Sequence, residues 1–339
     1  MERSRSFNKQ MSRVFVSGGA GFIGSHITDY LISEGHEVLV LDNLQGGYRD
    51  NVNPKSNFIQ GEICNQHLVN DTFHAFKPDY VIHAAAFASE NLSNNCPAYT
   101  ANNICVGTSN LIASSVNTEV KCFVNLSSIA VYGHQQPPFS EDAMPLPMDA
   151  YGAAKAYTEA LCRAAKHSFD LDYIIFRPHN VIGKNQNLAD KTRNVVSIFI
   201  RQALEGKPLT IFDDGLQTRA FSPISQVAPI IASSIENKNA YNQVFNIGGD
   251  KEYTVLDIAK MVCAATGAPE NVNFLPARKE AKHAFSNHEK LRKYFTEPSS
   301  KTVEETIAEM VDEARKQDMN PMQELPPIEI NKNIPDVWK

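Results

Sequence analysis

A glycine-rich stretch near the start of the chain, VFVSGGAGFIGS at residues 14–25, constrains the fold more than any other feature. A β-branched run leads into it and apolar residues then recur at helical spacing, which predicts a strand, a tight turn and a helix. Gly18, Gly21 and Gly24 leave no side chain where such a backbone turns sharply, approaches a pyrophosphate and packs helix on strand. The N–H groups that begin the helix would face that anion. The pattern therefore predicts a dinucleotide site.

The next apolar run, HEVLVLDN, supports this interpretation through its last residues. Asp42 follows Gly24 by about 18 residues, near the spacing of a carboxylate that binds the adenosine ribose. A 2′-phosphate would be repelled there, so NAD is favoured over NADP. The alternative is that Asp42 is a turn carboxylate bonded to its own backbone, a role that Asn43 could fill equally well.

Composition excludes several classes of protein. With 42% hydrophobic and 21% charged residues, the chain of 339 residues is typical of a soluble globular protein. A net charge of -6 and the absence of a basic stripe argue against a nucleic-acid partner. No apolar run is long enough to span a bilayer, so no membrane association is expected. The six cysteines lack zinc-site spacing, so no metal is expected, and they predict a reducing, cytoplasmic location.

Strands alternate with helices along the first half of the chain. This alternation predicts parallel strands with right-handed crossovers, and hence an α/β doubly wound sheet. After the second strand, we expect a third strand that runs from Phe58 and Ile59 into GEI, a helix ending before Pro78, a strand YVIHAAA, a helix over 97–116, a strand over 122–126, a helix over 151–167 and a strand YIIFRPHN.

The regular alternation of strands and helices ends after Gly183. Helices are predicted over 195–204 and 254–264, the segment 244–247 is expected to rejoin the main sheet, and Thr302 with Glu305 forms a capping-box pattern. The predicted parts are an NAD-binding domain at 11–183 joined by 223–250, a smaller substrate lobe at 184–222 and 251–318, and tails at 1–10 and 319–339.

A tyrosine and a lysine in the sequence YGAAK carry the candidate chemistry. Tyr151 and Lys155 are four residues apart and therefore share one face of a helix. An adjacent ammonium favours the phenolate, which makes the tyrosine a general base for an alcohol proton. Alone, this pair is more often a surface tyrosine beside a surface lysine. Here the pair follows a predicted dinucleotide site and a strand that ends in Ser127 and Ser128, which favours the catalytic interpretation. His83 ends another core strand and is expected to be packed rather than catalytic.

Five motifs together (GGAGFIGS, HAAA, SSIAVYG, YGAAK and FRPHNVIG) resemble the extended short-chain dehydrogenase/reductase family, in its NAD-dependent epimerase/dehydratase branch. Members like UDP-glucose 4-epimerase look closest. The likeness runs from Ser12 to about Tyr294 and is most specific in its N-terminal motifs. It implies a Rossmann domain with NAD, a smaller C-terminal substrate lobe, a nucleotide-diphosphate-sugar substrate of the UDP-hexose kind, and a homodimer formed through the helices over 97–116 and 151–167.

The resemblance also implies roles for single residues. It makes Tyr151 the base, Lys155 the group that holds the nicotinamide ribose and lowers the tyrosine pKa, and Ser128 the partner of the sugar hydroxyl. The residues that it assigns to the cofactor besides Tyr151 and Lys155 are Gly18, Gly21, Phe22, Ile23, Gly24, Asp42, Asn43, Glu62, Ile63, Ala84 and Ala85.

The diphosphate would lie against Asn180 and between two arginines, Arg219 and Arg278, whose guanidinium groups suit it. The alternative for each arginine is a surface ion pair. The family has an acid after the first arginine and an acidic DV pair shortly beyond, where this chain has Ala220 and, in SQV, Gln226. The substrate lobe is therefore expected to depart from the family pattern, which leaves the identity of the sugar open.

The two residues after Ser128 narrow the reaction. Related 4,6-dehydratases carry an Asp-Glu pair there and decarboxylating relatives a glutamate at the second position, whereas Ile129 and Ala130 exchange no proton. The resemblance thus favours 4-epimerisation of a UDP-glucose/UDP-galactose type of substrate by transient oxidation at C4. Another NAD-dependent sugar-nucleotide oxidoreductase or dehydratase, and a non-catalytic sensor of NAD or nucleotide sugar, remain as alternatives.

Overall fold

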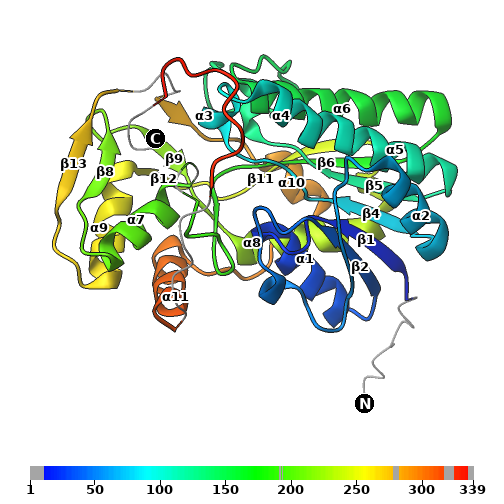
Figure 1. The fold of residues 1–339 in the computed structure, drawn as a ribbon, viewed down its shortest axis with the longest axis horizontal. Coiled ribbons are helices and arrows are strands. Elements are labelled where there is room, and N and C mark those ends of the chain that lie inside the picture. The colour runs from blue at the N-terminus through cyan, green and yellow to red at the C-terminus, as the bar shows by residue number, and fades with distance from the viewer. Residues whose placement is uncertain (1–10, 191, 193, 278–281, 317–323, 335–339) are drawn as a thin grey trace.

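The computed structural model describes residues 11–190, 192, 194–277, 282–316 and 324–334. Its centre is a parallel sheet in the order β11-β6-β5-β4-β1-β2-β3 (Figure 1). The order of the strands reverses between β1 and β4, and doubly wound sheets bind their ligands at such a point, beyond the carboxyl ends of the strands. The seven strands are β1 Arg13–Ser17, β2 Glu37–Asp42, β3 Asn57–Gln60, β4 Tyr80–His83, β5 Cys122–Leu126, β6 Tyr173–Pro178 and β11 Gln243–Ile247.

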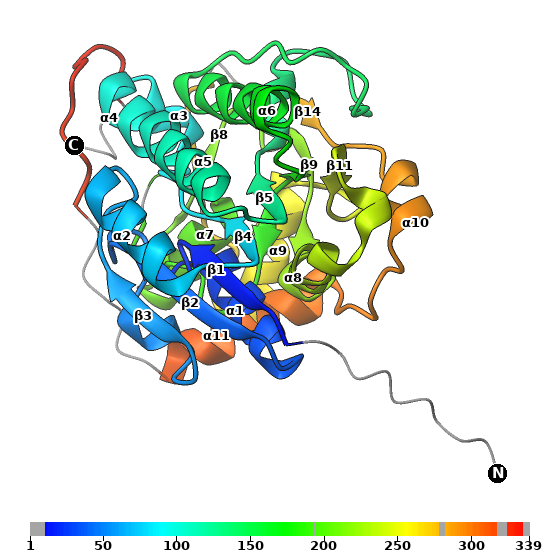
Figure 2. The ribbon, with the colours of Figure 1, turned by 90° about the vertical axis from the view of Figure 1, so that its right-hand side faces the viewer.

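Helices cover both faces of this sheet, because successive strand residues point to opposite sides. Phe15 belongs to one buried cluster, while Val14 and Val16 belong to the other. The α/β doubly wound prediction is confirmed (Figure 2). On the Phe15 side lie α2 Gln66–Phe76, α5 Gly107–Asn117 and α6 Ala150–Phe169, and on the other side lie α1 Phe22–Ser33, α8 Ile224–Ser233 and α10 Glu289–Tyr294.

Two strands end earlier than the sequence pattern predicts. The structure ends β3 at Gln60, so GEI is not a strand, and β4 ends at His83, so HAAA leaves the sheet after its first residue. The cause is loss of partners. Gln60 pairs with Asp42, the last residue of β2, and His83 pairs with Ser17, the last residue of β1. The helix predicted over 97–116 is also divided, into α4 Pro97–Ala101, a π-helical turn Asn102–Val106 and α5.

A second, smaller hydrophobic core lies beyond β6. It is built around α7 Val195–Leu204, α9 Val255–Thr266 and α11 Val303–Lys316. The capping box predicted at α11 is confirmed: Thr302 Oγ1 accepts from the Glu305 N–H at 3.1 Å and Glu305 accepts from the Thr302 N–H at 2.8 Å. Its short strands are β7 Val181–Ile182, β8 Leu209–Phe212, β9 Thr218–Ala220, β10 Ser222–Pro223, β12 Glu252–Thr254, β13 Val272–Leu275 and β14 His283–Ala284.

The segment 243–247 rejoins the main sheet as expected, since β11 pairs in parallel with β6. The exact domain boundaries stay a prediction. The expected C-terminal tail is not free over its described part, because residues 324–334 pack beside α3 Glu90–Ser93 and α4 (Figure 1). Within the described ranges, no helix combines the length and the apolar character needed to cross a bilayer.

Candidate active site

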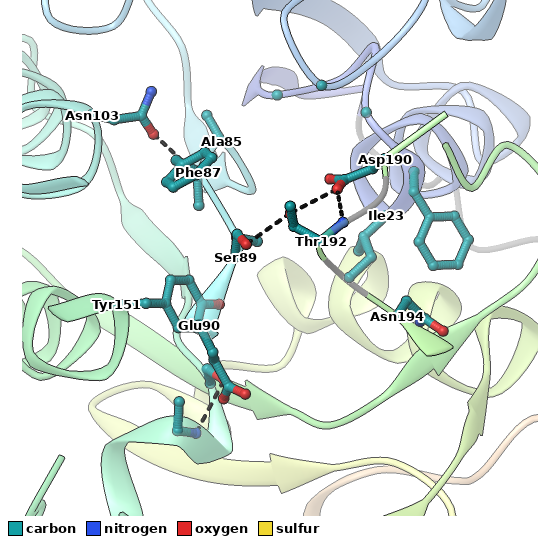
Figure 3. Close-up of a pocket in the computed structure, with 18 of the residues that line it drawn as sticks. Ile23, Ala85, Phe87, Ser89, Glu90, Asn103, Tyr151, Asp190, Thr192 and Asn194 are labelled. Carbon is teal, nitrogen blue, oxygen red and sulfur yellow. Dashed lines mark hydrogen bonds between the residues drawn. The ribbon is translucent and has the colours of Figure 1, made fainter. Parts of the chain in front are cut away.

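A pocket of about 700 Å³ lies at the carboxyl ends of the central strands (Figure 3). Lys155 lies outside its lining, and Arg278 lies outside the described residues. The other residues predicted for cofactor, catalysis or substrate all line this one pocket: Gly18, Gly21, Phe22, Ile23, Gly24, Asp42, Asn43, Glu62, Ile63, Ala84, Ala85, Ser128, Tyr151, Asn180 and Arg219.

The glycine turn has the shape that a pyrophosphate requires. Gly18 has a φ of +76°, and a Cβ on it would lie 2.6 Å from the Ala85 nitrogen. A Cβ on Gly24 would lie 2.1 Å from the Gly18 carbonyl oxygen. The N-cap of α1 is Gly21, which offers no side chain to the first N–H groups, and no acidic residue occupies the first turn. The start of this helix is therefore built to accept an external anion.

Gly24→Ala is expected to abolish measurable NAD binding, because the added methyl group can be accommodated only by moving the Gly18 carbonyl and so the turn. Titration of the purified variant with NAD checks this. Gly35→Ala is the matched control: residue 35 has a φ of +87° but its Cβ would meet nothing within 4 Å, so it reports backbone strain alone. Equal NAD affinity in Gly24→Ala and wild type would contradict the role of the turn.

At the adenosine end, Asp42 fits both interpretations of its role. Its carboxylate accepts from the Ala20 N–H at 2.9 Å and the Leu44 N–H at 2.8 Å, and it also lines the pocket. Burial raises the pKa of Asp42, partly opposed by these backbone donors. Asn43 Nδ2 donates to both oxygens of Glu62 at 3.0 and 3.1 Å. Two neighbouring carboxyl groups suit ribose hydroxyls and disfavour a 2′-phosphate, as NAD requires.

Tyr151 lies in the first turn of α6 with its side chain on the pocket (Figure 3). The helix begins there because the Asp149 carboxylate accepts from the Gly152 N–H at 2.7 Å, while Ser93 Oγ accepts from the Tyr151 N–H at 3.0 Å. Only 8% of Tyr151 is exposed. Its position is thus fixed by hydrogen bonds at both the cap and the residue itself.

Lys155 lies one turn further along α6, behind the pocket wall. Its Nζ is 5.8 Å from the centre of the Tyr151 ring and donates to the Leu126 carbonyl oxygen at 2.7 Å. Burial lowers the pKa of Lys155 to about 8, so the group is a cation at neutral pH. The predicted Tyr-Lys arrangement on one helix face is therefore present, with the positive charge next to the ring.

The Lys155 pKa makes stability depend on pH in a defined direction. Between its folded value of about 8 and its ordinary 10.5, the unfolded chain binds more protons than the folded one, so this residue adds stability as pH rises. Relative to Lys155→Met, wild type should gain up to about 3 kcal/mol between pH 7 and pH 10.5. Urea unfolding of both proteins across this range checks it, and a constant difference would contradict it.

The two serines that directly follow β5 have different surroundings. Ser127 Oγ donates to the Glu159 carboxylate at 2.6 Å inside the protein. Ser128 lines the pocket, and its Oγ accepts from the Ala130 N–H at 3.1 Å where it caps the 3₁₀ turn Ile129–Tyr132. Ile129 and Ala130 also line the pocket. Ser128 is thus the serine available to a ligand, and the two positions after it offer neither acid nor base.

On the substrate side, Asn180 and Arg219 reach the pocket from two different segments. Asn180 follows β6 with a φ of +40°, and its Nδ2 donates to the Ala220 carbonyl oxygen at 3.4 Å. Arg219, on β9, donates to the Thr218 carbonyl oxygen at 2.8 Å. Ala220 is buried in β9 and Gln226 is part of α8, and neither contributes to the lining. The departures from the family pattern therefore lie beside the pocket rather than in it.

The whole arrangement agrees with comparisons of the sequence. The model of the NAD dependent epimerase/dehydratase family matches residues 14–248. The chain belongs to this family. Its cofactor is NAD, and the glycine turn and the adenosine-side carboxyl groups described above fit that cofactor.

Relatives within the family differ in activity. The UDP-glucose 4-epimerase of Thermotoga maritima, solved with UDP-glucose, is 31% identical with a TM-score of 0.85 and covers 90% of this chain and 99% of its own. The Thermus thermophilus UDP-glucose 4-epimerase, solved with NAD, is 29% identical with a TM-score of 0.83, covering 89% and 99%. UDP-glucuronic acid decarboxylase 1 of Danio rerio is 31% identical over 79% of this chain, which spans 64% of that enzyme. Membership of the family thus establishes NAD as the cofactor. It does not establish which reaction the chain catalyses, because relatives with different activities are about equally similar to it.

A buried ion pair behind the family's Tyr-Lys face escaped the sequence analysis. Glu159 accepts two hydrogen bonds from Arg177 of β6, Nε at 2.8 Å and Nη2 at 2.7 Å, and both side chains are buried. The signal was present in the spacing: Glu159 lies four residues after Lys155, and Arg177 interrupts the apolar strand YIIFRP. The pair ties α6 to the sheet and fixes the helix that carries Tyr151.

A second missed contact joins the loop after β4 to the smaller core. Ser89 Oγ donates to Thr192 Oγ1 at 3.0 Å, and Thr192 donates to Asp190 through both its N–H and its hydroxyl at 2.8 Å (Figure 3). All three residues line the pocket. The local Asp-Thr turn has a sequence signature, but nothing in the sequence indicates the contact with Ser89.

His83 is packed, as the sequence analysis expects. Its ring nitrogens contact Ser17 Oγ at 2.7 Å and Thr108 Oγ1 at 2.9 Å, and it is fully buried outside the pocket lining. Burial, followed by the Lys155 charge, lowers the pKa of His83 to about 3. A neutral histidine with both ring nitrogens engaged supports the sheet rather than a reaction.

Proposed function

We propose that this chain catalyses the NAD-dependent 4-epimerisation of a nucleotide-diphosphate sugar of the UDP-glucose/UDP-galactose type. The observation that carries the proposal is the convergence of three elements on one pocket. The glycine turn, Ser128 and Tyr151 all line it, and Lys155 lies one helical turn behind the tyrosine ring.

In this proposal, the glycine turn and Asp42 would hold NAD, which would supply a reversible hydride acceptor for C4 of the sugar. Tyr151 accepts the proton from O4 and gives it back, while the Ser128 hydroxyl holds the same oxygen. The Lys155 cation favours the phenolate form of Tyr151. To hold the nicotinamide ribose as well, its Nζ would have to turn from the Leu126 carbonyl oxygen into the pocket. Asn180 and Arg219 anchor the diphosphate, so the sugar stays bound while its own ring turns over within the pocket.

The residues after Ser128 favour epimerisation over elimination. A dehydratase needs groups that exchange protons beside the sugar, and Ile129 and Ala130, which line the pocket, have none. The oxidised sugar would therefore have no neighbour at these positions to draw it into loss of water or of carbon dioxide. The carboxyl groups in the lining come from other segments than this turn, and Glu90, for example, is the first residue of α3.

Incubation of the purified protein with a panel of UDP-hexoses, including N-acetylated sugars and uronates, tests the proposal. Proton NMR should show inversion at C4 for at least one sugar, and absorbance should show no net accumulation of NADH. Stoichiometric NADH formation would indicate an oxidoreductase, and loss of water or carbon dioxide a dehydratase or decarboxylase. Binding of NAD and sugar without turnover of any substrate would support a sensor.

We also propose a cytoplasmic homodimer. The six cysteines form no disulfide, which suits a reducing compartment. The helices over 97–116 and 151–167 leave Val106 44% and Tyr157 43% exposed, an apolar contribution to the face through which a second copy would pack. The mass in solution checks the dimer, and a monomeric mass would reject it.

A further inference from the structure

The described C-terminal segment, residues 324–334 and here called the strap, is held by a buried asparagine. Asn95 Nδ2 donates to the carbonyl oxygens of Ile330 at 2.6 Å and Lys332 at 2.9 Å. The main-chain carbonyl oxygen of Asn95 accepts hydrogen bonds from the backbone N–H groups of Glu329 and Ile330 at 2.9 and 3.0 Å. Asn95 is 7% exposed, so these bonds form in a protected place and the strap is built into the fold.

A carboxylate adds a second attachment. Glu329 accepts from the N–H groups of Ala98 and Tyr99, each at 2.8 Å, and so caps the start of α4 with a negative charge where the helix dipole favours one. The strap also has an apolar side. Leu325, Ile328 and Ile334 pack against the fully buried side chains of Leu92 and Cys96.

The attached strap contributes directly to the pocket. Its first residues, Glu324, Leu325 and Pro326, belong to the lining together with residues 87–92, which lead into α3. Figure 1 and Figure 2 both show the strap running beside α4. One wall of the pocket therefore comes from a segment that lies well beyond residues 14–248, the range that the family model matches.

The end of α3 and the two residues after it contact both the start of α6 and the strap. Ser93 Oγ accepts from the Tyr151 N–H at 3.0 Å, and Asn94 Oδ1 accepts from the Ala150 N–H at 3.1 Å. The next residue is Asn95. Ser93, the last residue of α3, and the next two residues thus bind the helix of Tyr151 on one side and the strap on the other, so that three consecutive backbone positions connect the two sets of hydrogen bonds.

We propose that the strap is a positioning element for this site: by fixing the segment after α3 through Asn95 and the start of α4 through Glu329, it holds the first turn of α6 so that Tyr151 faces the pocket, and it closes the pocket on the α3 side. The positioning residue is Glu329, which acts through α4 and α3 and touches no reacting atom. Only the catalytic readout of this inference rests on the proposed function. The structural readouts do not.

Hydrogen–deuterium exchange on full-length Glu329→Ala, with Asn95→Ala as a second variant, tests the inference. Exchange should rise in α3 and at the N–H groups of Ala150 and Tyr151, while β5 and β6 keep their protection. With a turned-over UDP-hexose, KM should rise and kcat should fall roughly tenfold, as small misplacement of a catalytic group predicts. Ile330→Ala is the control, since its side chain is 45% exposed and its backbone bonds remain.

Unchanged exchange at α3 and the start of α6, or an equal rise across the central sheet, would overturn the inference. The two proposals fail separately. If wild type turns over no UDP-hexose, the proposed function fails, while hydrogen–deuterium exchange in Glu329→Ala, compared with Ile330→Ala, still decides the role of the strap.

Discussion

Tyr151→Phe is expected to lower turnover by about 10³-fold or more while NAD and sugar nucleotide still bind. The substitution removes only the phenol hydroxyl, which is the proposed proton acceptor. The ring remains and keeps its packing with Ile104, Ala130 and Ala154, so the fold should be unaffected. The chemical step would then lack a base, because the neighbouring Lys155 side chain is directed to the Leu126 carbonyl oxygen.

Single-turnover and steady-state rates with the best UDP-hexose provide the measurement, with NAD binding measured on the same preparation. Tyr157→Phe is the matched control on the same helix, because its hydroxyl contacts Ser109 at 2.9 Å outside the pocket. It should retain wild-type turnover. A Tyr151→Phe variant as active as Tyr157→Phe would remove the basis of the proposed mechanism.

Arg177→Met is expected to destabilise the protein by about 3 to 5 kcal/mol, because it leaves Glu159 buried without its bidentate partner. Glu159 is fully buried and Arg177 is 1% exposed, so water cannot replace the lost contacts. The same guanidinium also donates to the Tyr132 hydroxyl at 2.7 Å. Urea unfolding measures the loss, and a change below about 1 kcal/mol, the size of a surface pair, would contradict it.

In Arg177→Met, Glu159 keeps only the partly exposed Arg163, whose Nη2 lies 3.1 Å from its Oε2. The double variant Glu159→Met with Arg177→Met separates the cost of this poorly paired charge from the value of the pair, and should recover much of the stability lost in Arg177→Met. Acid gives a further check. Burial raises the pKa of Glu159, but hydrogen bonds and charge from Arg177 outweigh burial and hold it below 4.5. This stabilisation is therefore present above pH 4.5 and is lost as pH falls through the lowered value. The double variant should lack that part of the acid dependence.

Local spacing explains what could be predicted from the sequence. The glycine turn and the Tyr151-Lys155 face depend on residues within one turn or one helix, so periodicity is enough to find them. The doubly wound sheet follows from alternating strands and helices, and the return of β11 to it was visible as an apolar run. Family resemblance then assigned Ser128, Asn180 and Arg219, and all three line the pocket.

Contacts between distant segments explain what could not be predicted. The ends of β3 and β4 are set by where β2 and β1 end, which no pattern within the strands records. The hydrogen bonds from Ser89 to Thr192 and from Asn95 to the strap join residues that are far apart in the chain. Arg177 and Glu159 were detectable only as charges in apolar positions, without any indication that they pair.

The two backbone N–H groups bonded to Asp42 limit how the preference for NAD could change during evolution. Because this carboxylate supports the loops at Ala20 and Leu44, its loss would disturb the glycine turn as well as the proposed ribose contact. Glu62 is exposed and is bonded to the Asn43 side chain rather than to that turn. Acquisition of a 2′-phosphate preference would therefore have to begin at residues 43 and 62, with Asp42 among the last positions to change.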